Sequence, residues 1–208
     1  MPPSPTDVLV LLAHPRLAHS RVNAALHRAA LPLAGAGRLV LRDLYALYPD
    51  YDIDVAAERA ALARARLVVW QFPLQWYGLP PLLKLWLDEV FGFAWAYGPG
   101  GTALRGKDLW LAVSTGSGAS AYHPAGHHRH FIDAFWPPFE QTAALAGMRF
   151  LPPLVMHAAH RATADEIAAH AAVFAARLQQ WPAWPELADL EADTGCQVPA
   201  DERPGDAG

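Results

Sequence analysis

The stretch that decides the fold of this chain is Gln71-Phe72-Pro73-Leu74-Gln75-Trp76-Tyr77-Gly78-Leu79-Pro80-Pro81. It follows the apolar run 67–70 and precedes the amphipathic run 82–88, so the pattern predicts a buried strand, a loop and a helix in succession. The two prolines at its end suit the first turn of a helix, where a missing N–H needs no partner. The loop presents Trp76 and Tyr77 at the carboxyl end of a strand, which is where open α/β sheets bind ligands.

The rest of the chain repeats this alternation of apolar runs and helical patterns. Continuous apolar runs are typical of strands that are buried in a parallel sheet. Strands are predicted at residues 8–13, 38–44, 67–72, 109–113 and 149–157. Helices are predicted at residues 21–30, 55–66, 79–91, 131–147 and 163–181, with a loop at 45–54. The alternation indicates an α/β fold, a three-layer sandwich built around a five-stranded parallel sheet.

The strand order 2-1-3-4-5 is expected for this sheet, because right-handed crossovers leave few other topologies. In that order the carboxyl ends of strands one, three and four surround one crevice. Pro32 and two glycines are expected to end the first helix, and Pro137 with Pro138 to break or kink the start of the helix at 131–147. Pro152 with Pro153 marks the fifth strand as an edge or bulged strand. The folded domain is expected at residues 1–181, followed at 182–208 by a mobile tail that is rich in proline, glycine and acidic residues.

Composition limits the classes of protein that this chain can be. Its 208 residues are 53% hydrophobic and 17% charged, as in a globular domain, and the net charge is −4. No basic excess points to nucleic acid or to an anionic membrane surface. The single cysteine, Cys196, excludes an intrachain disulfide and a cysteine-rich metal site, and fits a reducing compartment. No secretory signal and no apolar run of about 20 residues is visible, so a cytoplasmic protein is expected.

Three unusual loops fall at the carboxyl ends of strands one, three and four. After strand one, Ser20 begins a helix whose free N–H groups and dipole attract phosphate, although a plain N-cap would have the same pattern. After strand three, Trp76 and Tyr77 suit a flat heterocycle, although such residues also fill cores. After strand four, residues 114–118 offer hydroxyls and N–H groups, as an ordinary turn also does. Because three such loops meet at one crevice, we expect a flavin there.

A histidine-rich loop follows strand four. It contains His123, His127, His128 and His130 within eight residues. A metal site is not expected, because these histidines lie in a loop with glycine and proline and have no adjacent carboxylate or thiolate. Tyr122 and an imidazole beside a redox ring can instead donate protons or stabilise an anion.

Several segments together resemble one known family. They are Ala13-His14-Pro15 with Ser20 and Asn23, Pro73-Leu74-Gln75-Trp76-Tyr77, Leu82-Leu83-Lys84-Leu85-Trp86-Leu87-Asp88, Phe93-Ala94-Trp95-Ala96-Tyr97-Gly98, Ser114-Thr115-Gly116, Tyr122-His123-Pro124-Ala125-Gly126-His127, Pro137 with Phe139-Glu140-Gln141-Thr142, and Leu151-Pro152-Pro153. Over about residues 7–181 the chain resembles the flavodoxin-like NAD(P)H:quinone oxidoreductases, the group that contains DT-diaphorase. Within that group it resembles the bacterial branch that includes ancillary proteins of glutathione-gated potassium-efflux systems.

The resemblance implies a flavodoxin-like fold and a homodimer with a flavin in each of two interface sites. It implies ping-pong two-electron transfer, in which NAD(P)H reduces the flavin and leaves before a quinone takes a hydride equivalent. FMN is expected rather than FAD, because the bacterial branch is similar to FMN proteins. By the same resemblance, Trp95 and Tyr97 would face the site of the partner subunit.

The resemblance also assigns residues to each part of the flavin. It assigns the phosphate region to Ser20, Arg21, Val22 and Asn23 with His14 nearby, the isoalloxazine to Pro73, Leu74, Gln75, Trp76 and Tyr77, and its polar edge to Ser114, Thr115, Gly116 and Ser117. Tyr122 and either His127 or His128 would stabilise charge on the reduced ring, and the Pro-x-Gly-His match favours His127. This chain departs from the family at Gly116-Ser117-Gly118, where a glycine pair usually follows the threonine.

Other functions remain as alternatives. The same resemblance covers regulatory ancillary subunits of glutathione-gated potassium-efflux antiporters, and such a role would bring the protein to the inner face of the membrane through its partner. The two functions can coexist in one protein. An azoreductase-like activity shares the hydride chemistry. A one-electron carrier like flavodoxin is disfavoured, because flavodoxins are usually strongly acidic and this chain has a net charge of −4.

Overall fold

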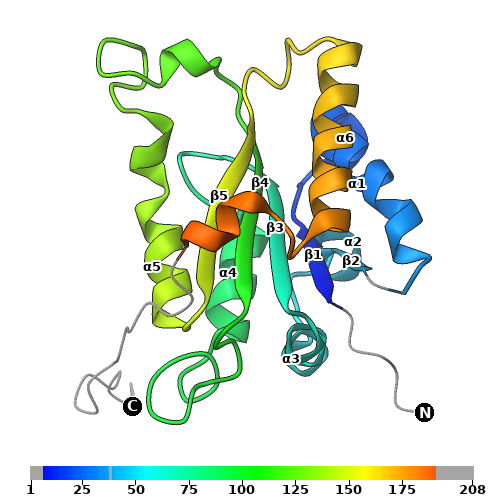
Figure 1. The fold of residues 1–208 in the computed structure, drawn as a ribbon, viewed down its shortest axis with the longest axis vertical. Coiled ribbons are helices and arrows are strands. Elements are labelled where there is room, and N and C mark those ends of the chain that lie inside the picture. The colour runs from blue at the N-terminus through cyan, green and yellow to red at the C-terminus, as the bar shows by residue number, and fades with distance from the viewer. Residues whose placement is uncertain (1–6, 38, 191–208) are drawn as a thin grey trace.

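The computed structural model describes residues 7–37 and 39–190 and contains one parallel sheet of five strands. The strands are β1 Val8–Leu12, β2 Leu39–Asp43, β3 Leu67–Pro73, β4 Asp108–Ser114 and β5 Arg149–Met156. Their spatial order is β2-β1-β3-β4-β5, and every pairing is parallel. The predicted α/β fold and the predicted order 2-1-3-4-5 are therefore confirmed (Figure 1).

Burial of the strands follows their place in the sheet. β1 and β4 are buried along their whole length and β3 up to its last residue, because helices cover both faces of the sheet. β2 and β5 form the edges and are only partly buried. The register slips opposite Pro152 and Pro153, between Trp110 and Ala112 of β4, so β5 is both an edge strand and an irregular one, as predicted.

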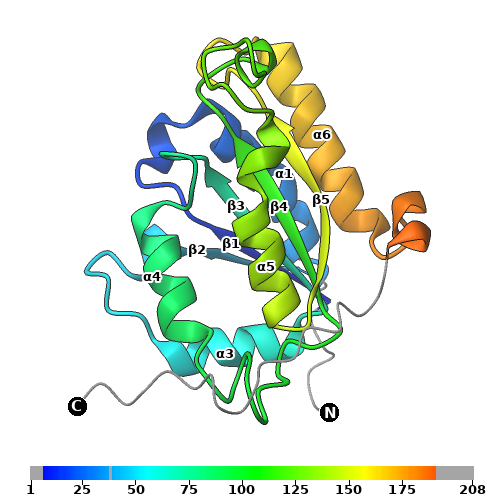
Figure 2. The same cartoon turned by 90° about the vertical axis from the view of Figure 1, so that its left-hand side faces the viewer.

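Six α-helices pack on the two faces of the sheet (Figures 1 and 2). They are α1 Arg21–Ala34, α2 Leu44–Leu47, α3 Val55–Arg64, α4 Pro81–Val90, α5 Pro137–Leu145 and α6 Ala164–Gln180. α1 and α6 cover one face over a core that includes Val10 and Trp110. α3, α4 and α5 cover the other face over a core that includes Trp70 and Trp86. The loops after β4 and β5 rise beyond the upper end of the sheet in Figure 1, and the loop after α4 lies at the lower end.

Two predicted local features were wrong. α1 continues to Ala34 with Pro32 inside it, so the proline does not end the helix; the chain turns at the glycines that follow, where Gly35 is the C-cap and Gly37 adopts a φ of 73°. The segment predicted as a loop at 45–54 begins with α2. The break predicted at Pro137 and Pro138 is confirmed: residues 132–135 form a 3-10 helix, and α5 begins at Pro137, because proline is compatible with the first turn of a helix. The capping box at Thr163 is present, with Glu166 as its partner.

Residues 182–190 pack onto the domain, although a mobile tail was expected from Pro182 onward. Trp184 and Leu187 are buried in the core under α1 and α6, and the indole N–H of Trp184 donates to the carbonyl of Arg177 at 2.8 Å. Large apolar side chains therefore outweigh the proline- and acid-rich composition in this segment. The rest of the predicted tail, with Cys196, lies outside the described residues.

A buried carboxylate ties β2, α2, α3 and α4 together. Glu58 accepts hydrogen bonds from Arg42 Nε at 2.8 Å, from the Tyr48 hydroxyl at 2.5 Å and from Trp86 Nε1 at 2.9 Å. The fully buried Glu58 thus neutralises one cation and satisfies two further donors. Removing a member of such a network leaves the others buried without a partner.

We predict that Glu58→Ala lowers the free energy of unfolding by about 3 kcal/mol, because Arg42 and Trp86 lose their acceptor in a buried site. Urea titration followed by circular dichroism measures the change. Lys84→Ala is the matched control: it removes an exposed ion pair with Asp88 on α4 and should change stability by no more than about 0.5 kcal/mol. An equal loss in the free energy of unfolding for the two substitutions would show that the buried network of Glu58 stabilises the fold no more than an exposed ion pair does.

Candidate functional site

A pocket of about 350 Å³ lies where the carboxyl ends of β1, β3, β4 and β5 meet. All three loops predicted to form a crevice contribute to its lining. The predicted residues that line it are His14, Ser20, Arg21, Val22, Pro73, Leu74, Ser114, Thr115 and Gly116. The predicted residues outside its lining are Asn23, Gln75, Trp76, Tyr77, Ser117, Tyr122 and His127.

Part of the lining was missed by the sequence analysis. Ala159 and His160, which follow β5, also border the pocket, as does His19 beside Ser20 in the first loop. The signal was available, because the rule that ligands bind at carboxyl ends of strands applies to β5 as well. Figure 1 shows the loop after β5 at the same end of the sheet as the loop after β4.

The N-terminus of α1 is held at the pocket by a buried amide. The Asn23 side chain donates to Ser114 Oγ at 2.9 Å and to Ser20 Oγ at 3.3 Å. Gln71 Nε2 donates to the backbone carbonyl of Asn23 at 2.9 Å. Asn23 is buried, and its two amide hydrogens are used inside the protein. Its geometry therefore suits a residue that positions Ser20, rather than one that contacts a ligand directly.

The phosphate-binding features predicted for the first loop lie together. Ser20 caps α1 by accepting a hydrogen bond from the backbone N–H of Asn23 at 3.1 Å. Arg21 and Val22 lie in the first turn, where the backbone N–H groups have no acceptor within the helix and can bind an anion. Burial and the charge of Arg16 lower the pKa of His14, so this histidine is neutral near pH 7. Arg21 is then the permanent cation in the lining of the pocket.

The loop after β3 forms a tight turn with two aromatic residues in a strained conformation. Gln75 and Gly78 exchange backbone hydrogen bonds of 3.2 and 2.9 Å, and the residues between them, Trp76 and Tyr77, have φ values of 47° and 65°. Turns with two positive φ values normally carry Asn or Gly, because a Cβ atom is unfavourable there. Trp76 is 94% exposed, so it does not fill a core. Strain of this kind gathers at functional sites.

Tyr77 connects this turn to the histidine-rich loop. Its ring stacks on Phe135 with a centroid separation of 4.9 Å, and its hydroxyl lies 3.2 Å from His128 Nδ1. The His128 ring in turn stacks on Tyr122 at 4.3 Å. The turn and the loop therefore share one aromatic cluster of Tyr77, Tyr122, His128 and Phe135.

The structure distinguishes the two histidines that the sequence left as alternatives. His128 lies between the two tyrosines, and its buried Nε2 has no hydrogen-bond partner among the described residues. His127, which the motif match favoured, is exposed and contacts His128 edge to face at 5.1 Å. Burial raises the pKa of Tyr122, while the Thr115 side chain opposes the shift, so Tyr122 keeps its proton at neutral pH.

Gly116 leaves open space at the pocket. A Cβ atom there would meet nothing within 4 Å, and the residue does not require a positive φ. Packing within the protein therefore does not explain this glycine. An open position beside the hydroxyls of Ser114 and Thr115 fits the close approach of a ligand's polar edge.

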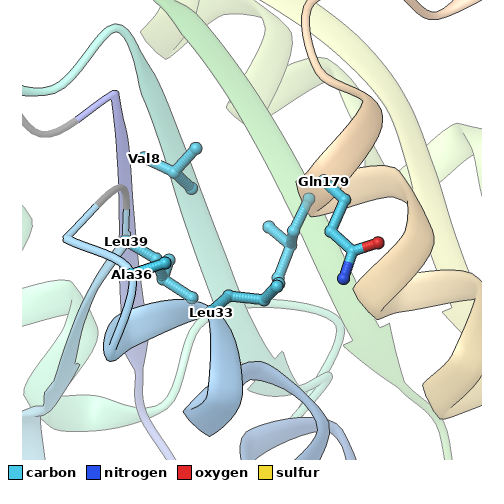
Figure 3. A pocket seen from close by; sticks show the side chains of 6 residues that line it. Val8, Leu33, Ala36, Leu39 and Gln179 are labelled. Atoms are coloured by element: carbon cyan, nitrogen blue, oxygen red, sulfur yellow. The ribbon is translucent and has the colours of Figure 1, made fainter.

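A second pocket lies at the opposite end of the sheet, beside the amino ends of β1 and β2. It has about 170 Å³ and is lined by Val8, Leu33, Ala36, Leu39, Leu178 and Gln179 (Figure 3). None of these side chains titrates, and none was predicted for the site. The predicted residues that line a pocket lie at the other end of the sheet.

Trp95 and Tyr97 lie far from the pocket of their own chain. They belong to the loop between α4 and β4, which lies at the amino ends of the strands. Arg59 stacks on Trp95 with its guanidinium carbon 4.8 Å from the ring centroid. A role for Trp95 and Tyr97 at a flavin requires a second subunit, and this role stays a prediction.

In the part of the chain that the structure describes, no three His, Cys, Asp or Glu side chains come close enough to share a metal ion. No helix in residues 7–37 and 39–190 combines the length and the apolar character that crossing a bilayer requires.

A parallel sheet of this order with a pocket at its carboxyl ends defines a flavodoxin-like α/β protein. A family model described as the flavodoxin-like fold matches residues 6–178. The chain belongs to the flavodoxin-like NAD(P)H:quinone oxidoreductase family, in the bacterial branch that includes ancillary proteins of potassium-efflux systems.

Three relatives illustrate this membership. The glutathione-regulated potassium-efflux system ancillary protein KefF of Citrobacter koseri is 47% identical over 174 residues, 84% of this chain and 96% of that protein. General stress protein 14 of Treponema denticola, solved in complex with FMN, is 38% identical with a TM-score of 0.79, over 83% of this chain and 98% of that chain. An NADPH-quinone reductase from P. pentosaceus is 27% identical with a TM-score of 0.72, over 81% of this chain and 95% of that chain.

The strained turn generates a prediction about stability. Trp76→Asn should raise the free energy of unfolding by up to about 1 kcal/mol, because Asn tolerates a positive φ and the exposed indole makes few contacts. The same change should weaken FMN binding by about tenfold, because it removes an aromatic ring. Thermal unfolding and quenching of FMN fluorescence measure the two effects.

Trp76→Phe is the control for this prediction, since it keeps both a ring and the strained backbone. It should leave stability unchanged and retain most of the FMN affinity. A loss of stability in Trp76→Asn would show instead that the indole packs against the protein.

Proposed function

We propose that this protein is an FMN-dependent NAD(P)H:quinone oxidoreductase. The observation that carries the proposal is that a helix N-terminus with Arg21, the strained turn at Trp76 and the open loop at Gly116 converge on one edge of the sheet. Each of these suits one part of a flavin: an anion, a flat apolar ring and a polar edge. The FMN complex of the T. denticola relative and the quinone reductase from P. pentosaceus support the same reading.

The residues of the pocket divide the work of binding. We assign the FMN phosphate to Ser20, Arg21 and Val22, with Asn23 holding Ser20 in place. Leu74 and the turn 75–77 would support the ring, and residues 114–117 would donate to its polar edge. FAD is the alternative cofactor, and FMN is preferred because the T. denticola relative was solved with FMN.

The reaction takes its redox chemistry from the cofactor. When bound, FMN would accept a hydride from NAD(P)H and pass two electrons to a quinone, in ping-pong order. Tyr122 and His128 would hold protons near the ring and stabilise negative charge on it, because a protonated phenol and an imidazole are both donors. The exposed Trp76 and Tyr77 would leave one face of the ring open to a flat substrate.

A homodimer belongs to this proposal. Trp95 and Tyr97 lie at the wrong end of the sheet to reach the pocket of their own chain, and a partner subunit could bring them to it. Their aromatic rings would then border the open side of the flavin, where the flat substrate would bind.

A second candidate function is that of an ancillary subunit of a glutathione-gated potassium-efflux antiporter. The observation that favours it is the 47% identity to the KefF protein of C. koseri over most of both chains. We propose a cytoplasmic protein that reaches the inner face of the membrane through such a partner. Pull-down with the antiporter's cytoplasmic domain tests this role separately from the enzymatic one.

The enzymatic proposal predicts that the purified protein binds FMN and oxidises NAD(P)H anaerobically when a benzoquinone is supplied. Initial rates at varied concentrations of both substrates should give parallel double-reciprocal lines, because the donor product leaves before the acceptor binds. FMN without protein is the control for the uncatalysed reaction. Absence of both flavin binding and turnover would refute the proposal.

The position of His128 generates a further prediction. His128→Ala should lower kcat by at least about tenfold while FMN stays bound, because a donor beside the reduced ring is lost. His127→Ala is the matched control on the neighbouring exposed residue and should stay within about twofold of the wild type. The reverse result would restore the assignment that the Pro-x-Gly-His match favoured.

A further inference from the structure

The first residues of the loop after β5 are hydrogen-bonded to the loop after β4. Thr115 N donates to the carbonyl of Met156, Ala158 N donates to that of Ser117, and Ala159 N donates to that of Thr115, each at 2.9 Å. Ala158 has a φ of 52°, which is unfavourable for a residue with a Cβ atom. These hydrogen bonds stabilise the strained backbone at Ala158, and they bring His157 next to Thr115.

One side-chain contact joins the same two loops. The Thr115 hydroxyl lies 2.8 Å from the carbonyl of Ser117 and 3.1 Å from His157 Nδ1. A carbonyl oxygen can only accept, so the single hydroxyl proton of Thr115 serves Ser117. With the hydroxyl proton of Thr115 on the bond to Ser117, we assign Nδ1–H of His157 as the donor and Thr115 Oγ1 as the acceptor. The hydrogen-bond pattern thereby selects the tautomer of His157 that is protonated on Nδ1.

His157 also packs beside the predicted redox residues. Its ring centroid lies 5.4 Å from that of Tyr122, which stacks on His128. Burial lowers the pKa of His157, so the ring is neutral near pH 7. His157 does not line the pocket, but it contacts Thr115, which does.

We propose that His157 is a positioning residue of the flavin site: its Nδ1–H donates to Thr115 Oγ1 and thereby fixes the 115–117 loop and the ring of Tyr122. The inference rests on the proposed flavin function, because the loop it orients is the one assigned to the polar edge of the ring. Without this donor, the Thr115 hydroxyl can turn away from Ser117, and the loop N–H groups lose their alignment with a ligand.

The test compares two substitutions of His157. His157→Asn keeps a donor at the same number of bonds from Cβ as Nδ1, whereas His157→Leu fills similar space without a donor. We expect His157→Leu to lower kcat of the FMN-loaded enzyme by about tenfold or more, because small misplacements of reacting groups are costly. We expect His157→Asn to stay within about threefold of the wild type. His170→Asn, on α6, is the control for a histidine elsewhere.

A double-mutant cycle then asks whether His157 acts through Thr115. In a Thr115→Val background the hydroxyl is already absent, so His157→Leu should add less than about a twofold further loss. Nitrogen-15 NMR of the flavin-free protein is an independent readout and should show a protonated Nδ1 on His157. The flavin midpoint potential should shift in His157→Leu and return toward the wild-type value in His157→Asn.

Specific outcomes would overturn the inference. Equal loss of kcat in the Asn and Leu variants would mean that the donor is irrelevant, and so would full additivity with Thr115→Val or an unprotonated Nδ1. Wild-type protein that binds no FMN would instead refute the proposed function, while the NMR result would still report the hydrogen bond on its own.

Discussion

The buried amide of Asn23 is the contact on which the geometry of the site depends. It joins the first turn of α1 to the end of β4 through Ser114, and the Gln71 side chain of β3 donates to the backbone carbonyl of the same residue, Asn23. A buried amide is favourable only when its polar atoms find partners, so these elements are locked in one arrangement. The helix N-terminus, the turn after β3 and the loop after β4 therefore meet at one pocket.

Packing outside the pocket holds its loops in conformations that are unfavourable for the isolated chain. The turn at Trp76 and Tyr77 has two aromatic residues at positive φ, and Tyr77 is retained by stacking on Phe135 and by contact with His128. The loop after β4 is held by the loop after β5, which itself is strained at Ala158. The site is thus supported by neighbouring loops that need not touch a ligand.

Much of the fold was predictable because burial leaves a strong pattern. The buried strands around Val10, Trp70 and Leu111 are continuous apolar runs, and a parallel order then follows from the rules of chain connection. The errors fell where local residues and tertiary contacts disagree. Pro32 lies inside α1, and Trp184 draws a proline-rich segment onto the domain by burying its ring. Neither the continuation of α1 past Pro32 nor the burial of Trp184 can be read from the pattern of neighbouring residues.

By itself the sequence determined the alternation of strands and helices, the order of the sheet and the edge at which chemistry would gather, because each depends on short-range periodicity and on general rules of topology. Tertiary structure alone decided that Asn23 is buried and that His128 rather than His127 lies between the tyrosines. Those outcomes depend on which side chains meet across distant segments. The spacing of residues along the chain does not reveal such contacts.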